Sequence, residues 1–207
     1  SRSEFSRQAY WLRARWESGD YPLAPRLSRI LFNTAPAVQA VTLRDEILGS
    51  SDGSEKQRFR CVRAPVLAGQ RLQVRERELP TAAEQALIKQ AGGDDAITVI
   101  DDGSGRAREI WVRWLPVPDF YASGPRDRHY VLDALSGEIG FGDGRNGLIP
   151  PAGAGNVRLA HYRTGGGARG NRPADSIVQL KTTVPYVDKV SNREPAEGGA
   201  EAEALES

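Results

Sequence analysis

The chain has 207 residues, of which 39% are hydrophobic and 27% are charged, and its formal net charge at pH 7 is +1. This composition is typical of a soluble globular protein of one or two domains, with no overall electrostatic attraction to nucleic acid or membranes. The single cysteine, Cys61, excludes an internal disulfide framework and a zinc site of several thiolates. No apolar run approaches the roughly 18 residues of a membrane span, so we expect none.

Short segments in which apolar and polar residues alternate predict β-strands along most of the chain. They lie at 10–16, 71–76, 96–101, 108–114, 129–134, 156–163 and 176–182. Ser136 and Gly137 predict a tight hairpin that joins 129–134 to a further strand, "EIGF" (138–141). Only 81–93 predicts a helix, because Thr81 and Glu84 can form a capping box and Gly92 follows its C-terminal end. We therefore predict a mostly β fold of short antiparallel strands in sandwich-like modules, with one short helix near 81–91.

Changes in composition along the chain predict three parts. Residues 1–40 are interpreted as the end of a preceding β module with a proline-rich connector, and 41–190 as the main β-rich domain. Residues 191–207 contain five glutamates and one leucine, which predicts an acidic linker or tail that leads to a further domain. Methionine is absent, so we expect the chain to be a processed product or an internal piece of a longer protein.

Residues 136–171 hold 11 of the 22 glycines, which indicates that several positions here need backbone conformations that other residues rarely adopt. A phosphate-binding loop is disfavoured, because no Gly-x-x-x-x-Gly-Lys-Ser/Thr motif is present and Pro150 and Pro151 interrupt the helix that should follow. A calcium loop is disfavoured as well, since the stretch around Asp143 supplies one carboxylate and an arginine, while 101–105 is interpreted as a hairpin loop. Tight turns between short strands explain the glycines better.

Candidate catalytic groups are few. The two histidines, His129 and His161, lie in or beside strand patterns, where a structural role is the simpler interpretation. Trp111 and Trp114 fall on opposite faces of one predicted strand, so we expect one in the core and the other exposed as a sugar platform or interface residue. Cys61 is expected to be a small buried hydrophobe. We assign no catalytic residue, no cofactor and no metal ligand.

Several stretches resemble one known family. The run "LGSSDGSEKQRFRCVRAPVLAGQRLQVRE" (48–76) and the run "SGPRDRHYVLDALSGEIGFGDGRNGLIPPAGAGNVRLAHYRTGGGARGN" (123–171) resemble the baseplate assembly proteins of phage-like contractile injection systems, the baseplate J-like or wedge family. The closing residues 184–207 are similar to that family's entry into its J-like domain, and residues 10–37 resemble its strand-plus-"NT" junction more weakly. The resemblance covers roughly residues 45–207.

This resemblance implies a non-enzymatic structural protein that surrounds the tail hub beneath the sheath and rearranges when the sheath contracts. The partners it implies are other wedge and hub proteins and copies of the chain itself, with no nucleic acid and no small-molecule substrate. It also implies a cytoplasmic location during assembly and then a place in a phage tail-like or extracellular injection particle. Family members are several times longer, so we expect an internal fragment without the J-like core.

Arginine makes up 24 of the 28 basic residues, which indicates either interface use or a GC-rich genome. We predict that "GDGRNGLIPPAG" (142–153) and "RTGGGARGN" (163–171) are adjacent loops at one end of the β-domain that dock a neighbouring subunit. The predicted interface residues are Arg126, Arg128, Asp143, Arg145, Arg163, Arg169 and Trp111. The alternative function is a carbohydrate-binding β-sandwich that uses Trp111 or Trp114 with the glycine loops, and an unrecognised type of enzyme is the third.

Overall fold

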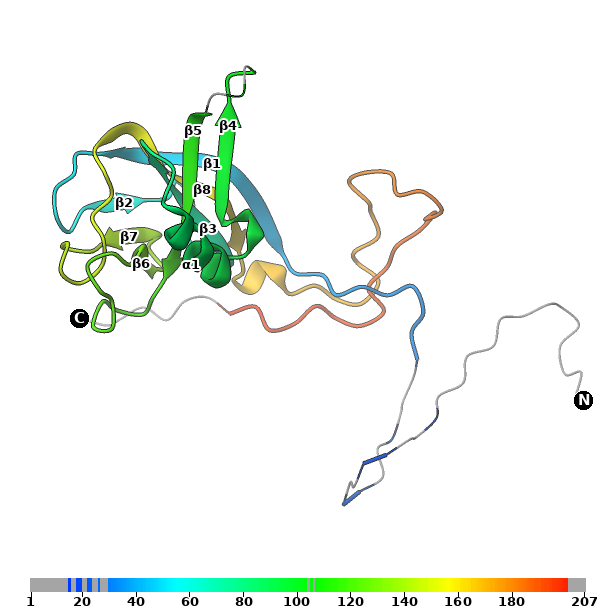
Figure 1. Ribbon diagram of the computed structural model, residues 1–207. Helices are drawn as coiled ribbons and strands as arrows, with labels where there is room; N and C mark the ends of the chain where they lie inside the picture. The colour runs from blue at the N-terminus through cyan, green and yellow to red at the C-terminus, as the bar shows by residue number, and fades with distance from the viewer. Residues whose placement is uncertain are drawn as a thin grey trace, which may run out of the picture. The chain divides into compact units, whose positions relative to one another are not determined.

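A computed structural model of the chain describes residues 15, 18–19, 22–23, 26, 30–103, 105 and 107–200. The chain divides into two compact units, Ser1–Ala37 and Val38–Ser207. In the first unit, the strand predicted over 10–16 lies, apart from Arg15, outside the described residues. The second unit contains all helices and strands of the described residues (Figure 1).

Eight strands of this unit form one hydrogen-bonded sheet. The strands are β1 (Ala40–Ser51), β2 (Arg58–Arg60), β3 (Val66–Glu76), β4 (Ile97–Asp101), β5 (Ala107–Pro116), β6 (His129–Asp133), β7 (Glu138–Phe141) and β8 (Gly153–Gly165). Their order is β1-β8-β3-β5-β6-β7-β2, and β4 pairs with β5 beside this path. Neighbours are antiparallel except β5 and β6, which run parallel over a short stretch. The predicted mostly β class is confirmed.

The first and last strands of the sheet approach each other. The backbone N–H of Val62, just after β2, donates to Oε1 of Glu46 in β1 at 2.7 Å. A Cβ atom added to Gly49 in β1 would lie only 3.0 Å from the ring of Phe59 in β2. The sheet therefore curls around its core and brings its outer strands together, without backbone pairing between β1 and β2 in the strand order.

The core fills the inside of this curled sheet. Trp114, Tyr130 and Phe141 extend into it from three neighbouring strands, and the Trp114 and Phe141 rings meet edge to face at 5.1 Å between centroids. Such aromatic pairs add stability beyond the area that they bury. The buried core residues are Cys61, Val66, Leu72, Val74, Trp114, Tyr130, Ile139, Phe141, Val157, Leu159 and Tyr162. The expectation that one tryptophan and Cys61 are buried is confirmed.

Helix α1 (Ala82–Gly92) begins at the predicted capping box. The Glu84 N–H donates to Oγ1 of Thr81, and the Thr81 N–H donates to Oε2 of Glu84 at 2.9 Å. No α1 residue is buried, so its caps and the bond from Nη1 of Arg113 to the Gly92 carbonyl (2.7 Å) hold it in place. Two short 3-10 turns, η1 (Asp94–Ala96) and η2 (Ala168–Gly170), complete the elements.

Most of the strand predictions are confirmed, and their exceptions have local causes. The strands predicted at 71–76, 96–101, 108–114, 129–134, 138–141 and 156–163 are present. β1 and β2 were not predicted, because charges and the left-handed Asp45 (φ 51°) interrupt the alternation in β1 and β2 has only three residues. The strand predicted over 176–182 is wrong, since no strand among the described residues pairs with this strand-forming sequence.

Candidate functional site

The two glycine-rich loops predicted to form one interface lie at opposite ends of β8. β8 begins at Gly153, directly after the loop 142–152, and ends at Gly165, directly before residues 166–171. Thirteen residues of strand separate the two loops, which corresponds to roughly 40 Å at about 3.3 Å per residue. The predicted adjacency of these loops is therefore wrong, and the predicted interface residues do not form one patch.

Trp111 lies on the outer face of β5, yet it is only 2% exposed. The guanidinium of Arg158 lies 4.0 Å from the ring centroid and that of Arg75 lies 5.6 Å away, so two cations cover the ring. The indole Nε1 donates to Oε2 of Glu109 at 2.8 Å, and this bond is the main reason that the pKa of Glu109 is lowered. Trp111 is thus not the exposed platform or interface residue that we predicted, and Trp114 lies in the core.

The predicted interface arginines divide into engaged and exposed residues. Arg128 donates from Nε and Nη2 to the two carboxylate oxygens of Glu76 at 2.7 and 2.9 Å, and both side chains are largely buried. Arg163 donates from Nη2 to the carbonyl of Ala68 at 3.1 Å. A bidentate pair of this kind stabilises the fold and leaves little of the guanidinium for a partner. The exposed members of the set are Arg126, Arg145 and Arg169.

Asp143 organises the turn that contains it. Its Oδ1 accepts the backbone N–H groups of Asn146 at 2.8 Å and Arg145 at 3.0 Å, and the bond from Asn146 is the main cause of its lowered pKa. A Cβ atom on Gly142 would lie 2.4 Å from the carbonyl oxygens of Asn146 and Gly147, so only glycine fits there. The turn interpretation of this glycine is confirmed. Within the described residues, no three His, Cys, Asp or Glu side chains gather as a metal site would require.

A buried polar network joins the two stretches that carry the family resemblance. The Ser51 N–H donates to Oδ1 of Asn156 at 2.8 Å, and Oγ of Ser51 donates to the carbonyl of Pro150 at 2.8 Å. Nδ2 of Asn156 donates to the carbonyl of Pro151 at 2.7 Å, and Nε2 of Gln57 donates to Oγ of Ser51 at 3.0 Å. The "LGSSDG" and "PPAGAGN" motifs therefore form one structural unit.

A cleft of about 530 Å³ opens on the outer face of β2, β6 and β7, and we call it the β2–β7 cleft. Val131, Gly140 and Arg58 form one cross-strand row of its floor. A Cβ atom on Gly140 would meet nothing within 4 Å, so this glycine deepens the floor. Loop 118–121 and loop 142–146 form the sides, and Tyr121 is 94% exposed. The volume of this cleft and its mixture of apolar and charged lining residues are typical of a binding site.

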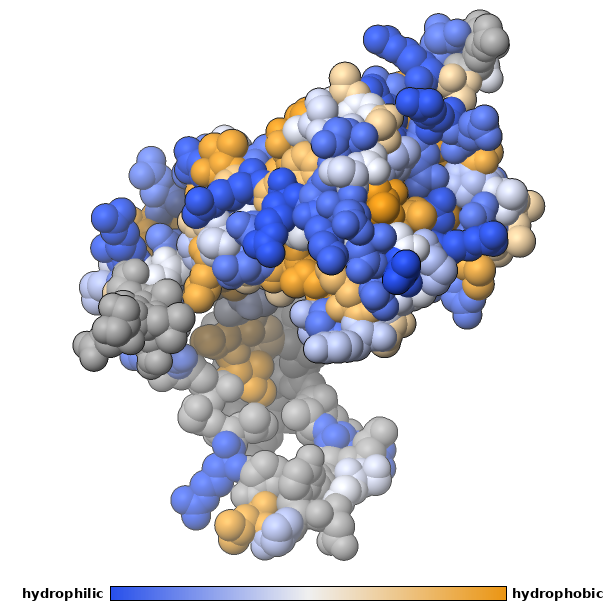
Figure 2. Space-filling model, turned by 90° about the vertical axis from the view of Figure 1, so that its left-hand side faces the viewer, coloured by the Kyte–Doolittle hydropathy of each residue, from blue (hydrophilic) through white to orange (hydrophobic). Residues whose placement is uncertain are grey.

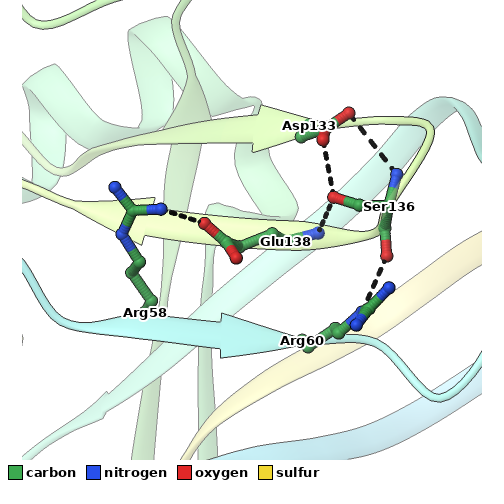
Figure 3. Close-up of polar contacts among 5 residues, drawn as sticks. All are labelled: Arg58, Arg60, Asp133, Ser136 and Glu138. Carbon is green, nitrogen blue, oxygen red and sulfur yellow. Dashed lines mark hydrogen bonds and ion pairs between the residues drawn. The ribbon is translucent and has the colours of Figure 1, made fainter. Parts of the chain in front are cut away.

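The charged groups of this cleft are fixed by short contacts (Figure 3). Asp133 accepts the Ser136 hydroxyl at 2.6 Å, which is the main reason that the pKa of Asp133 is lowered. Glu138 pairs with Arg58, and Arg60 donates from Nε to the Ser136 carbonyl at 3.0 Å. Asp133, Glu138 and Arg60, which are partners across β6, β7 and β2, are thus oriented before any ligand binds.

The β2–β7 cleft carries an excess of negative charge. Its lining includes two cations, Lys56 and Arg58, against four carboxylates, which gives a formal charge of −2. The carboxylates are those of Asp119, Asp133, Glu138 and Asp143. On the side of the molecule that carries β2 and β7, hydrophobic areas lie between hydrophilic side chains (Figure 2). The cleft is therefore suited to a ligand with apolar groups and a positive charge.

A second cleft, of about 620 Å³, lies between α1 and the loop that leads to β6, and we call it the α1 cleft. Leu87 and Ile88 supply its apolar part. Arg113, Arg126 and Arg128 outnumber its two acidic residues, which gives a formal charge of +1. Two of the predicted interface arginines, Arg126 and Arg128, therefore belong to this cleft. The segment that carries them is hydrogen-bonded to loop 142–152, because the Leu148 N–H donates to the Asp127 carbonyl at 2.9 Å.

Residues 176–191 form a loop that we call the arm (orange in Figure 1). Asn192 closes it: the Ile177 N–H donates to Oδ1 of Asn192 at 2.8 Å, and Nδ2 of Asn192 donates to the Pro173 carbonyl at 2.8 Å. Arg172 and Ala196, which lie just outside Pro173 and Asn192 in the chain, form a β-bridge. Part of the predicted tail 191–207 is therefore hydrogen-bonded to the main unit. The exposed large apolar residues of the arm are Ile177, Val178, Leu180, Val184, Tyr186 and Val187.

Neither the β2–β7 cleft nor the arm was predicted from the sequence. The cleft is lined by residues between 56 and 146, and a short stretch of sequence does not predict which of them come together on one face of the sheet. The arm did give a signal, because its strand-like sequence at 176–182 contains apolar residues that find no partner strand. An unpaired apolar segment of this kind indicates an interaction surface.

Comparisons with protein-family models, curated proteins and solved structures find no match to this chain. Among the described residues, no helix is both long and apolar enough to cross a membrane.

Proposed function

We propose that this chain is a structural wedge component of the baseplate of a phage tail-like contractile injection system. It acts through protein–protein contacts around the tail hub. The baseplate assignment rests on the resemblance of residues 48–76 and 123–171 to the baseplate assembly proteins. The Ser51–Asn156 network supports this assignment, because it makes the two stretches parts of one folded unit.

The observation that carries a structural role is the apolar arm. Six large apolar side chains are exposed within 177–187, although the arm is closed at its base by Asn192. Such an exposed apolar surface does not stabilise a monomer in water, whereas a subunit of a larger particle can bury it against a neighbouring subunit. The proposed partners are other wedge and hub proteins and further copies of the chain. We propose assembly in the cytoplasm, followed by incorporation into the particle.

Carbohydrate binding is the less favoured function. Sugar recognition by a β-domain commonly needs an exposed aromatic ring, and both candidate tryptophans, Trp111 and Trp114, are buried. We expect no binding above background on an array of mono- and polysaccharides. Specific binding of one sugar class would favour this alternative over the structural role.

The baseplate proposal is tested on particles. Contractile tail-like particles are purified from cells that produce the chain, washed free of soluble protein and labelled with gold-conjugated antibodies against the chain. We expect label at one end of each particle, at the same end before and after sheath contraction. Antibodies pre-absorbed with the chain are the control. Label distributed along the sheath, or particles without the chain, would contradict the proposal.

A further inference from the structure

Strand β4 has one unpaired edge. It pairs with β5 on one side, and no strand in the described part of the chain pairs with its other side. The β4–β5 hairpin extends past the other strands of the sheet (Figure 1). The first four residues of β4, 97–100, are all β-branched, and Val99 and Ile100 are 48% and 41% exposed. An exposed edge of this composition is a template for pairing with a further strand.

The two outer strands of the curled sheet are protected against such pairing. The ladder of β1 has register shifts on both sides of Gly49 and contains the left-handed Asp45. β2 has only three residues and faces β1. Bulges and very short strands are devices that block edge pairing in natural proteins. β4 has no bulge, lysine or proline over residues 97–100, which pair with β5 in one uninterrupted register.

The arm contains a strand-forming segment, residues 176–182, that pairs with no strand among the described residues. Within it, Val178 and Leu180 are 63% and 37% exposed. The Ile177 N–H donates to Oδ1 of Asn192 at 2.8 Å. Because the backbone groups of successive strand residues point to opposite sides, those of Val178 and Leu180 face away from Asn192 when the segment is extended. One edge of the segment is thus anchored, and the other is free to add to a sheet.

The arm and β4 are attached at different levels of the sheet. The arm starts beyond the C-terminal end of β8, where a Cβ atom on Gly170 would contact Oε1 of Gln39, the residue before β1. Through the pairings with β5 and β3, Ile97 in β4 lies level with Val157 in β8. Val157 precedes the end of β8 at Gly165 by roughly 26 Å of strand. The other residues of β4 lie farther still, and β4 is three strands away from β8.

The closed arm is too short to bring its segment to β4 of the same copy. Pro173 follows Gly170 by three residues, which span at most roughly 10 Å. Asn192 holds Pro173 and Ile177 side by side. Gln179, the centre of the segment, follows Ile177 by two residues, or at most roughly 7 Å. The strand that pairs with β4 must therefore come from another molecule.

We propose that segment 176–182 of one copy adds to the free edge of β4 in a second copy and extends its sheet by one strand. Val178 and Leu180 supply the backbone groups of the new ladder, and the side chains of the segment pack beside Val99 and Ile100. Because segment and edge are different surfaces, the contact is heterologous, so a joined pair still offers one segment and one edge for further assembly. The inference deepens the proposed structural role and rests on it for its biological setting.

Sedimentation of the full chain over a range of concentrations measures this association. Val178→Pro removes an N–H group from the free edge of the segment. Gln179→Pro is the matched control, because it restricts the backbone equally but removes an N–H group from the opposite edge. We expect Val178→Pro to weaken association at least about ten-fold and Gln179→Pro to change it less than about two-fold. Equal effects of the two prolines, or an unmodified chain that stays monomeric, would overturn the proposal.

Lysines on the edge test the other half of the contact. Val99→Lys together with Ile100→Lys places a charge on each face of β4, which natural edge strands use to prevent pairing. The control is Val41→Lys with Ile47→Lys in β1, where the two residues are similarly exposed, at 53% and 51%. We expect association to weaken at least about ten-fold for the β4 variant alone. Weakening by the β1 variant alone would show that the segment adds to a different edge.

Mixing two variants tests whether segment and edge meet each other. The Val178→Pro chain keeps an intact β4 edge, and the chain with Val99→Lys and Ile100→Lys keeps an intact segment. At a concentration where the unmodified chain associates, we expect each variant alone to be monomeric and the mixture to form a dimer of the two and nothing larger. A mixture that stays monomeric would contradict the proposal. Gold-labelled particles together with a monomeric mixture would remove the strand contact and leave the baseplate proposal standing, and a dimer with unlabelled particles would do the reverse.

Discussion

Asn156 holds together the end of the domain at which the two family-like stretches meet. Its side chain accepts from the Ser51 N–H at 2.8 Å and donates to the Pro151 carbonyl at 2.7 Å, and Asn156 is 1% exposed. Asn156→Ala removes both bonds and leaves the buried Ser51 N–H without that partner. We expect this substitution to destabilise the second unit strongly, because no water can reach the N–H group easily.

The magnitude follows from the two groups that lose a partner. A buried donor left unsatisfied costs about 1–3 kcal/mol, and the Pro151 carbonyl, which lies nearer the solvent, adds about 1 kcal/mol. The free energy of unfolding should therefore fall by about 2–4 kcal/mol, which corresponds to a Tm lower by about 5–15 °C for a domain of this size. Asn156→Asp should cost at least as much at neutral pH, because a carboxylate cannot donate to Pro151.

Urea unfolding followed by tryptophan fluorescence measures this change. The midpoint should move to lower urea with an unchanged slope, since the same surface is exposed on unfolding. Gln179→Ala, which removes an exposed amide, is the matched control and should change the free energy of unfolding by less than about 0.5 kcal/mol. A loss below about 1 kcal/mol for Asn156→Ala would refute the reasoning, because the network would then carry little of the stability.

Two further predictions concern the outer face and the alkaline pH range. Arg158→Ala uncovers Trp111, so the fluorescence emission should shift to longer wavelength. The free energy of unfolding should fall by about 1–2 kcal/mol. An unshifted emission spectrum would show that Arg158 does not cover the ring. Burial raises the pKa of the Cys61 thiol to about 11 and of Tyr130 to about 12, and raises that of Tyr162 as well. The folded state keeps these protons longer than the unfolded state, so stability is complete below about pH 9 and should decline as pH rises from 9 to 12. Tyr162→Phe should make this decline shallower, and an unchanged slope in urea titrations at pH 8 to 11 would count against the assignment.

The interface hypothesis changed most when the fold was known. Trp111 was expected to be exposed because it alternates with Trp114, and it does lie on the outer face. Its burial depends on Arg158 in β8 and Arg75 in β3, which come to lie over the ring only because β3 pairs with β5 and β8 pairs with β3. Alternation reports the face of a strand, and it cannot report what covers that face.

The glycine-rich loops illustrate the same limit on a larger scale. Both were correctly interpreted as turns, since Gly142 and its neighbours make close backbone contacts within a few residues. Their adjacency was wrong because it depends on where β8 begins and ends. Loops on either side of one long strand must lie far apart, whatever their composition.

The sequence by itself determined the local structure: six of the strands, the capped helix after Thr81, the turns around Asp143 and the burial of one tryptophan. These features depend on side-chain alternation and on hydrogen bonds between residues a few positions apart, so a short window of sequence contains their cause. The tertiary structure alone decided the Ser51–Asn156 network, the cover over Trp111 and the charge of the β2–β7 cleft. Each of these joins groups that lie tens of residues or more apart in the chain, and their meeting is set by strand pairing and by the curl of the sheet, which no local pattern contains.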